Sequence, residues 1–228
     1  MKRSIFFVLL FLSVSLFAGD NVTHFLGIPV DGTKSSMIQK LRAKGFKKPK
    51  FGKGDLVGEF NGTYVRLYVS TNKTKVYRIV VEDWNLSDEG DIKIRFNRLC
   101  DQFKKNKKYI PSTLEKNEDF RIPDDEDISD QMNLYNKRYE ASYIQLPQGM
   151  DDESLATDVS EMLRSNYTET QIANPSESEK NEMTYNITEY LRQYSNKLVW
   201  FMIDNTFPNY RILLFYDNLD NQANGEDL

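Results

Sequence analysis

The chain has 228 residues, of which 39% are hydrophobic and 13% aromatic, and its formal net charge is −4. This content is enough for the packed core of one large or two small domains, and it excludes global disorder. The acidic balance argues against a nucleic-acid partner, because proteins that bind nucleic acid usually carry a basic face.

The first 19 residues have the three-part layout of a secretory signal peptide. Lys2 and Arg3 precede an apolar run over 4–17, which is shorter than the roughly 20 residues that a membrane-spanning helix needs. Small residues follow at 18–19, although a large residue, Leu16 or Phe17, stands three positions before the expected cleavage site. An uncleaved N-terminal anchor is therefore the alternative.

The expected mature protein is periplasmic or secreted, with no membrane span after cleavage and a charge of −6 once Lys2 and Arg3 are removed. Cys100 is the only cysteine, so no residue at the end of the apolar run could carry a lipid, and no intramolecular disulfide can form. Small exported domains without a large core usually depend on disulfides. This chain is expected to depend on packing, which is more typical of a bacterial protein.

Residues 20–110 are predicted as one unit of helix, meander and helix. The first helix covers 33–44, with Thr33 as its N-cap and Gly45 just past its end. Asn61-Gly62 is a strong hairpin signal, because both residues tolerate positive φ. The expected strands are 55–60, 63–70 and 76–83. A second helix over 91–106 has one apolar stripe, formed by Ile92, Phe96, Leu99, Cys100 and Phe103.

Residues 111–217 are predicted as a second α+β unit, followed by a disordered tail over 218–228. The acidic stretch 123–127 looks like the first turn of a short helix. The other expected elements are a strand over 137–146, helices over 153–167 and 177–194, and strands over 197–204 and 210–216. The predicted fold class is α+β, an antiparallel sheet with helices packed on one face and the other face partly open.

One internal similarity is visible between residues 77–86 and 210–219. Each stretch begins with Tyr-Arg-Ile and ends with Asn-Leu, and each follows an expected strand and a short polar turn. This pattern predicts a duplicated helix-plus-hairpin unit, with two tandem copies in the chain. The alternative is chance likeness between two short strands.

Two resemblances involve mainly the first half of the chain. The stretch FLGIPVDGT at 25–33, with GEFNG at 58–62 and RFNRLC at 95–100, resembles uncharacterised exported proteins of the Bacteroidales. That family supplies no functional residues to transfer. The order of helix and meander is also similar to that of the β-lactamase-inhibitor-protein-like group, whose tandem units form a sheet that grips other proteins. This second resemblance is one of architecture only, and it transfers no function to this chain.

Residues for nucleophilic or zinc chemistry are scarce. His24 is the only histidine and is expected on a solvated leader, so a Ser-His-Asp or Cys-His site would have to recruit it there. Cys100 lies on the apolar stripe of its helix, where a buried thiol is inert. We therefore assign no catalytic residue, no metal ligand and no cofactor.

Carboxylates and lysines leave three alternatives open. The acidic run 124–130 could ligate calcium, but it lacks the alternating ligands and turn glycine of a recognised loop, and an acidic helix start explains it. Any Asp and Glu pair could meet in space, so a carboxylate-dependent hydrolase of polysaccharide or peptide is the alternative function. A basic stretch could touch anionic polysaccharide or lipid, or be a solvated loop; it consists of Lys44, Lys47, Lys48, Lys50 and Lys53.

The most informative surface is the predicted open face of the sheet. Strand side chains alternate, so Tyr64, Arg66 and Tyr68 point away from the face that packs on the helices. Tyr139 and Tyr143 share one face of another strand, and either Arg78 or its neighbours Tyr77 and Ile79 could join them. Tyr and Arg are enriched in binding hot spots, although aromatic residues also suit any exposed strand. The leading hypothesis is a non-enzymatic binding protein that binds an envelope protein or glycan with Tyr64, Arg66, Tyr68, Arg78, Tyr139 and Tyr143.

Overall fold

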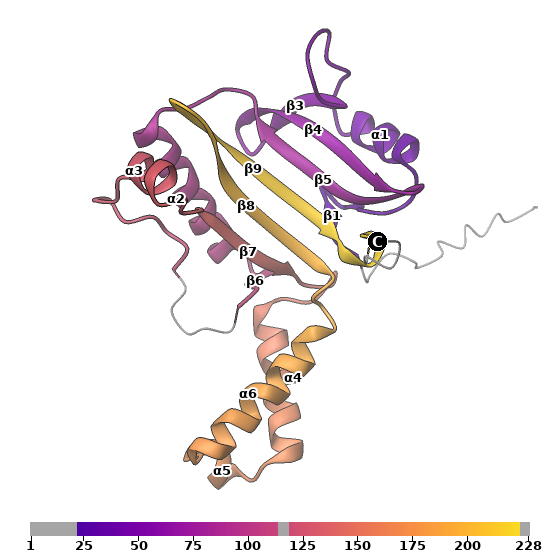
Figure 1. Ribbon diagram of the computed structural model, residues 1–228. Helices are drawn as coiled ribbons and strands as arrows, with labels where there is room; N and C mark the ends of the chain where they lie inside the picture. The colour runs from indigo at the N-terminus through magenta and orange to yellow at the C-terminus, as the bar shows by residue number, and fades with distance from the viewer. Residues whose placement is uncertain (1–21, 114–118, 224–228) are drawn as a thin grey trace, which may run out of the picture.

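The computed structural model describes residues 22–113 and 119–223, which form an α+β fold. A seven-stranded antiparallel sheet is the centre of the molecule, and a two-stranded hairpin of β1 (His24–Phe25) and β2 (Ile28–Pro29) accompanies it (Figure 1). The α+β class expected from the sequence is confirmed. The expected signal peptide, residues 1–19, lies outside the described residues.

The helix and meander predicted after residue 30 are present. Helix α1 (Lys34–Ala43) begins at Thr33, whose hydroxyl accepts a hydrogen bond from an amide of the first turn, and it ends before Gly45, which has a φ of +101°. Three strands follow, β3 (Leu56–Phe60), β4 (Thr63–Asn72) and β5 (Lys75–Asp83). The turn between the first two has positive φ at both central residues, as the Asn-Gly pair requires.

Helix α2 (Glu89–Lys105) follows the meander and carries the predicted apolar stripe. Asp88 caps its first turn, and Lys104 and Lys105 lie in its last turn, where they complement the helix dipole. All five residues of the stripe are buried. Asn97 is buried beside them and exchanges two hydrogen bonds with the backbone of Ile122, which ties a later segment of the chain to the helix.

The second half adds four strands and four helices to the described chain. Its strands are β6 (Tyr109–Pro111), β7 (Glu140–Gln145), β8 (Lys197–Thr206) and β9 (Asn209–Asn218). Its helices are α3 (Ile128–Leu134), α4 (Asp152–Asn166), α5 (Glu169–Ala173) and α6 (Glu177–Arg192). Helix α5 was not predicted, because the segment between the two long helices read as a polar break.

The strand order in the large sheet is β3-β4-β5-β9-β8-β7-β6. The pairing of β5 with β9 therefore joins the two halves of the chain into one continuous sheet. Residues that are direct partners on neighbouring strands form rows across the sheet. One such row contains Leu67, Val81, Leu214, Phe201 and Ala141. All five are buried in one hydrophobic cluster with residues of α1 and α2. This face of the sheet is the core face.

Helices cover the core face alone. Helix α1 packs on β4 and β5, and α2 packs on β8 and β9. The opposite face, which we call the open face, is turned toward the viewer in Figure 1, and no described helix covers it. Its rows carry polar and aromatic side chains, such as the row of Tyr68, Val80, Phe215, Trp200 and Ser142. The predicted one-sided packing is therefore present.

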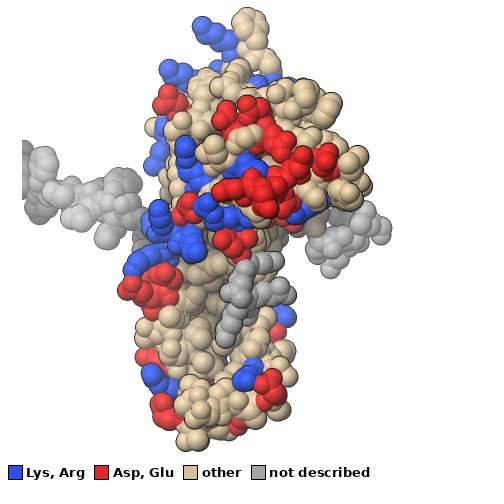
Figure 2. Space-filling view, turned by 90° about the vertical axis from the view of Figure 1, so that its left-hand side faces the viewer, with Lys and Arg blue, Asp and Glu red and all other residues tan. Residues whose placement is uncertain are grey.

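Helices α4, α5 and α6 follow β7 and precede β8 in the chain. They form an arm that extends away from the body (Figures 1 and 2). A small second cluster at its base includes Leu146, Leu155 and Tyr194. Residues 151–192 carry ten Asp and Glu against three Lys and Arg, a local net charge of −7. Since the whole chain has −4, the remainder of the molecule carries +3.

The described residues near both ends of the chain are more ordered than the sequence suggested. Thr23 and Phe25 are completely buried, and the ring of Phe25 lies 4.8 Å from that of Tyr216. Asn218 is the last residue of β9, and residues 219–221 form a short 3-10 helix. The expected solvated leader around His24 and a tail starting at 218 are therefore wrong. The two segments bind one another, since Asn218 donates to the carbonyl of Val30 and Asn221 to the carboxylate of Asp31, and local sequence could not show these contacts.

The similarity between residues 77–86 and 210–219 falls on two neighbouring strands. Under that alignment Val81 corresponds to Leu214, and these two residues are direct partners in the β5–β9 ladder. Helix α1 packs on β4 and β5, and α2 packs on the strands that correspond to them, β8 and β9. This arrangement is compatible with a local two-fold relation, and duplication stays a prediction.

Candidate functional site

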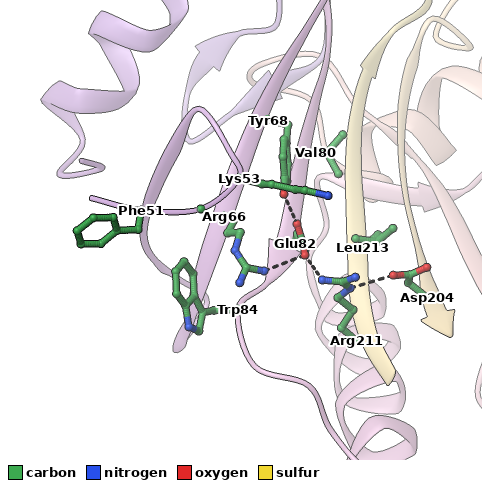
Figure 3. Close-up of a pocket in the computed structure, with 11 residues that line it drawn as sticks. Phe51, Lys53, Arg66, Tyr68, Val80, Glu82, Trp84, Asp204, Arg211 and Leu213 are labelled. Carbon is green, nitrogen blue, oxygen red and sulfur yellow. Dashed lines mark hydrogen bonds and ion pairs between the residues drawn. The ribbon is translucent and has the colours of Figure 1, made fainter. Parts of the chain in front are cut away.

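A hollow of about 630 Å³ lies on the open face where β4, β5 and β9 run side by side (Figure 3). Its floor is made of strand residues, and its rim is made of the loop before β3, the residue after β5 and the end of β8. The floor residues are Arg66, Tyr68, Val80, Glu82, Arg211 and Leu213, and the rim residues are Phe51, Gly52, Lys53, Trp84 and Asp204.

Strand alternation explains why charged and apolar residues share this floor. On β4, Val65 and Leu67 point into the core, so Arg66 and Tyr68 point to the open face. Register then places Arg66 opposite Glu82, and Glu82 opposite Leu213. The charged side chains are thus held over the middle of the sheet, away from its edges.

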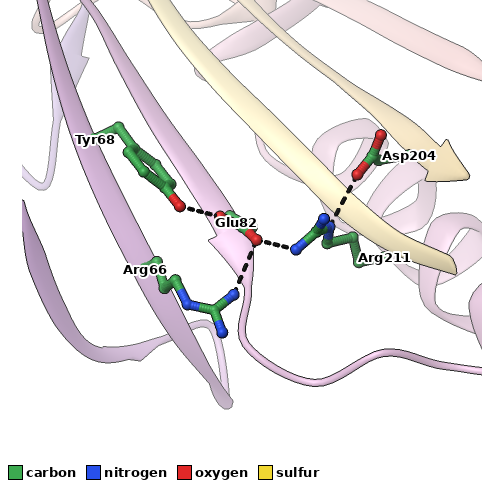
Figure 4. Close-up of polar contacts among 5 residues, drawn as sticks. All are labelled: Arg66, Tyr68, Glu82, Asp204 and Arg211. Carbon is green, nitrogen blue, oxygen red and sulfur yellow. Dashed lines mark hydrogen bonds and ion pairs between the residues drawn. The ribbon is translucent and has the colours of Figure 1, made fainter. Parts of the chain in front are cut away.

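Glu82 is the centre of the polar network in the hollow (Figure 4). Its Oε1 accepts hydrogen bonds from Nη1 of Arg66, at 2.9 Å, and from Nη1 of Arg211. Its Oε2 accepts a hydrogen bond from the hydroxyl of Tyr68 at 2.5 Å. The Nε of Arg211 also donates to Asp204 at 2.9 Å. With a side chain only 9% exposed, Glu82 holds two guanidinium groups and a phenol in fixed positions.

Aromatic rings border the same hollow. The guanidinium carbon of Arg66 lies 4.0 Å from the ring centroid of Trp84, a cation–π contact. The ring of Tyr64, which is 44% exposed, meets Trp84 edge-on at 5.4 Å. Phe51 is 88% exposed at the rim, and its ring is directed away from Glu82 (Figure 3). The structure thus brings Tyr64, Arg66 and Tyr68 together on the open face, as expected.

Tyr68 makes the stability of the fold depend on pH in the alkaline range. Burial, with the hydrogen bond to Glu82, raises the pKa of Tyr68 from 10.0 to about 12. The folded state therefore keeps this proton more tightly than the unfolded chain. Its contribution to stability is complete below about pH 10 and is lost as the pH rises through about 12. In Tyr68→Phe, the unfolding free energy from urea titrations should decline less steeply over that range than in wild type.

Tyr135→Phe is the matched control for this measurement, because Tyr135 is 70% exposed. It should follow the wild-type curve. An equal alkaline decline in wild type and Tyr68→Phe would contradict the role assigned to the Tyr68 hydroxyl.

Arg78 lies on the open face but outside the hollow. It donates from Nε and Nη2 to both carboxylate oxygens of Asp217, at 2.6 and 2.7 Å. Asp217, itself buried, also accepts a hydrogen bond from the indole of Trp200 at 2.9 Å. Trp200 stacks on Phe215 with ring centroids 3.9 Å apart. Arg78 therefore belongs to a second network, whose side chains bind one another.

Tyr139 and Tyr143 do not lie on the open face, and their predicted place there is wrong. Tyr143 is 3% exposed and stacks on Phe103 of α2 with ring centroids 4.5 Å apart. Tyr139 is 6% exposed and donates its hydroxyl hydrogen bond to Glu126. The two do share a face, as alternation required, but it is the core face. An aromatic ring with one hydroxyl suits a core wherever that hydroxyl finds a partner.

The remaining sequence candidates have structural roles. Cys100 is buried, and burial raises the pKa of its thiol to about 12, as expected for an inert cysteine. In the acidic run, Asp127 caps α3 and Glu126 binds Lys137. Lys93 donates to backbone carbonyls of the same run. Within residues 22–113 and 119–223, no group of three or more His, Cys, Asp or Glu is placed to hold a metal ion.

Several residues of the hollow were not predicted from the sequence: Phe51, Lys53, Glu82, Trp84, Asp204 and Arg211. Two weak signals existed. Arg211 corresponds to Arg78 in the internal similarity, and Glu82 alternates with Val81 on the same strand as Arg78. Neither signal could show that β9 would lie beside β5.

Comparisons with known proteins give no relative from which function could be transferred. No family model matches the chain, and no curated protein or solved structure matches it. Among the described residues, no helix is both long and apolar enough to cross a membrane.

Proposed function

We propose that this chain is an exported, non-enzymatic binding protein that recognises its ligand with the open face, at the hollow around Glu82. One observation carries the proposal. A buried carboxylate holds Arg66 and Arg211 in fixed positions on the floor of a hollow that no described helix covers. Long side chains that are already ordered lose less entropy when a ligand binds.

The composition of the hollow supports the same proposal. Trp, Tyr and Arg are the residues enriched in binding hot spots. Here Arg66, Tyr68 and Trp84 line one hollow, and the ring of Tyr64 contacts Trp84 at its rim. The apolar side chains of Val80 and Leu213 lie in the same floor. A ligand would thus meet apolar surface and oriented hydrogen-bond donors together, as in most small-ligand sites.

The alternative, a carboxylate-dependent hydrolase, has less support from this geometry. The two carboxylates in the hollow are Glu82 and Asp204, and both accept hydrogen bonds from Arg211. Both oxygens of Glu82 are already engaged, by two arginines and by Tyr68. A general acid or a nucleophile needs an oxygen that faces the substrate.

The binding proposal is tested by affinity capture from bacterial envelope extract. The site variant is Phe51→Ser/Lys53→Ser, since both residues line the hollow and both are exposed, so the fold should be unaffected. The control is Tyr185→Ser/Lys180→Ser on α6, which likewise removes one exposed aromatic residue and one exposed lysine, but from the arm. Wild type and control should retain a component that the site variant loses.

Equal recovery of every component by all three proteins would contradict the proposal. Wild-type release of reducing ends or peptide fragments from the extract, abolished in the site variant, would favour the hydrolase instead.

A further inference from the structure

We propose that the ligand of the open face is an acidic polysaccharide, one whose sugar rings carry carboxylate groups. This inference rests on the proposed binding function and names its ligand class. Three observations carry it: the charge around the hollow, an unoccupied guanidinium edge on Arg66, and the position of the hollow in the middle of the sheet.

Charge is the first observation. The hollow contains Lys53, Arg66 and Arg211 against two carboxylates. The loop that supplies Phe51 and Lys53 also carries Lys48 and Lys50, both exposed, a few residues before the rim. The chain as a whole has a charge of −4, and the arm alone has −7. A positive region on an acidic protein attracts anionic ligands and repels cationic ones, which favours an anionic partner at this place.

The second observation concerns the guanidinium edge of Arg66 that is formed by Nε and Nη2. Arginine binds a carboxylate best through two parallel N–H groups. Arg78 binds Asp217 in this way through Nε and Nη2, and Arg95 binds Asp83 through the same pair. Arg66 engages only Nη1, with Glu82, and among the described residues no hydrogen bond occupies its Nε and Nη2.

The edge of Arg66 is also held in place. Trp84 lies against the plane of the guanidinium, and Glu82 fixes its other side. The side chain is 20% exposed, so it is reachable from the hollow. On the opposite side of Glu82, Arg211 uses Nε and Nη1, and the structure gives its Nη2 no partner among the described residues. A ligand carboxylate on Arg66 would thus have a second donor nearby.

The third observation separates a sugar from a peptide. Peptides that dock on sheets usually pair their main chain with an exposed edge strand. Here the floor is formed by β4, β5 and β9, and each of these strands is paired on both sides. Recognition must therefore come from side chains alone.

Sugars fit side chains of this kind. Their hydroxyls can pair with Asp204 and Lys53, and their C–H faces can lie on an aromatic ring, whose face is electronegative. Phe51 offers such a ring at the rim, exposed between lysines and next to Gly52, whose φ is +93°. Phe51 is thus an aromatic surface at the rim that a sugar extending beyond the hollow could cover.

The test uses polygalacturonate oligomers and the same oligomers with every carboxylate methyl-esterified. Titration calorimetry with the full protein should show binding of the acid form, at least about tenfold weaker binding of the ester, and loss of affinity as salt is raised. Arg66→Gln and the loop variant Lys48→Ser/Lys50→Ser/Lys53→Ser should each weaken binding of the acid form by about tenfold or more.

The matched control is Lys104→Ser/Lys105→Ser/Lys108→Ser, which removes three exposed lysines at and just beyond the end of α2 and should bind like wild type. The loop variant keeps the test decisive even where Arg66→Gln fails to fold, because its three residues are exposed.

Three results would overturn the inference. They are absence of binding to polygalacturonate, equal affinity for acid and ester, and stronger site-dependent binding of polyglutamate or a single-stranded oligonucleotide. If any of these occurs while affinity capture still finds a component lost in Phe51→Ser/Lys53→Ser, the ligand class is wrong and the binding function stands. If capture also fails, both proposals are wrong.

Discussion

Glu82→Ala should lower the free energy of unfolding by about 3–5 kcal/mol, because it leaves two half-buried guanidinium groups without their shared carboxylate. Arg66 and Arg211 are only 20% and 21% exposed. They cannot turn fully into solvent without leaving the strand face, and they would repel each other across the vacated position. In a domain of this size, each kcal/mol lowers the melting temperature by roughly 2–4 °C. Urea unfolding followed by circular dichroism measures the change.

Glu140→Ala is the matched control for this prediction. Glu140 lies on β7 in the same row of the sheet, but its side chain is 51% exposed and its partner Arg138 is 61% exposed. A surface ion pair of this kind contributes about 0–1 kcal/mol. If the free energy of unfolding falls no further in Glu82→Ala than in Glu140→Ala, Glu82 is not the centre of the polar network.

A triple variant separates stability from recognition. Arg66→Met/Glu82→Leu/Arg211→Met replaces the buried ions by apolar side chains of similar size, and such exchanges are often neutral or stabilising. We therefore expect the triple variant to be more stable than Glu82→Ala while losing all binding. That outcome would mean that the charged network is retained for recognition and not for the stability of the sheet.

Phe201→Ala should destabilise the fold by about 3–5 kcal/mol, because it opens a cavity in the aromatic centre of the core. Phe201 is completely buried on β8. Its ring centroid lies 4.9 Å from that of Phe96 and 5.6 Å from that of Phe103, both on α2, and 6.3 Å from that of Tyr143. This cluster fastens α2 to the sheet, so its loss should reduce the cooperativity of the whole body.

The control is Phe51→Ala, at a ring that is 88% exposed, where the change should stay within about 0.5 kcal/mol. Thermal unfolding of the two variants beside wild type measures the difference. Similar midpoints for Phe201→Ala and wild type would show that the cluster does not hold α2 in place.

Local signals were sufficient for most of the secondary structure. The Asn61-Gly62 turn, the N-cap at Thr33 and the apolar stripe of α2 each depend on neighbours within a few residues. Their energetics are local, so they could be predicted before any tertiary contact was known. The ends of the chain were predicted less well, because Phe25 and Asn218 are ordered by residues far away in the sequence.

The site residues could be predicted only where side-chain alternation along a single strand was enough to place them. Alternation on β4 separated Tyr64, Arg66 and Tyr68 from the core residues between them. The same rule correctly placed Tyr139 and Tyr143 on one face of their strand, but the face that we expected, the open face, was wrong. Alternation shows which residues share a face of the sheet, and it does not show which face is covered by helices. Amphipathic tyrosines leave that choice to the tertiary structure.

The sequence by itself determined the α+β class, the meander, the two framing helices and the open-face position of three residues of the site. Only the tertiary structure decided that β9 would lie beside β5, and hence that Arg211 and Glu82 would meet although 129 residues separate them. The physical reason is that an antiparallel ladder forms between any two strands with compatible faces. Which strands pair is selected by the packing of the whole core, and no local pattern contains that information.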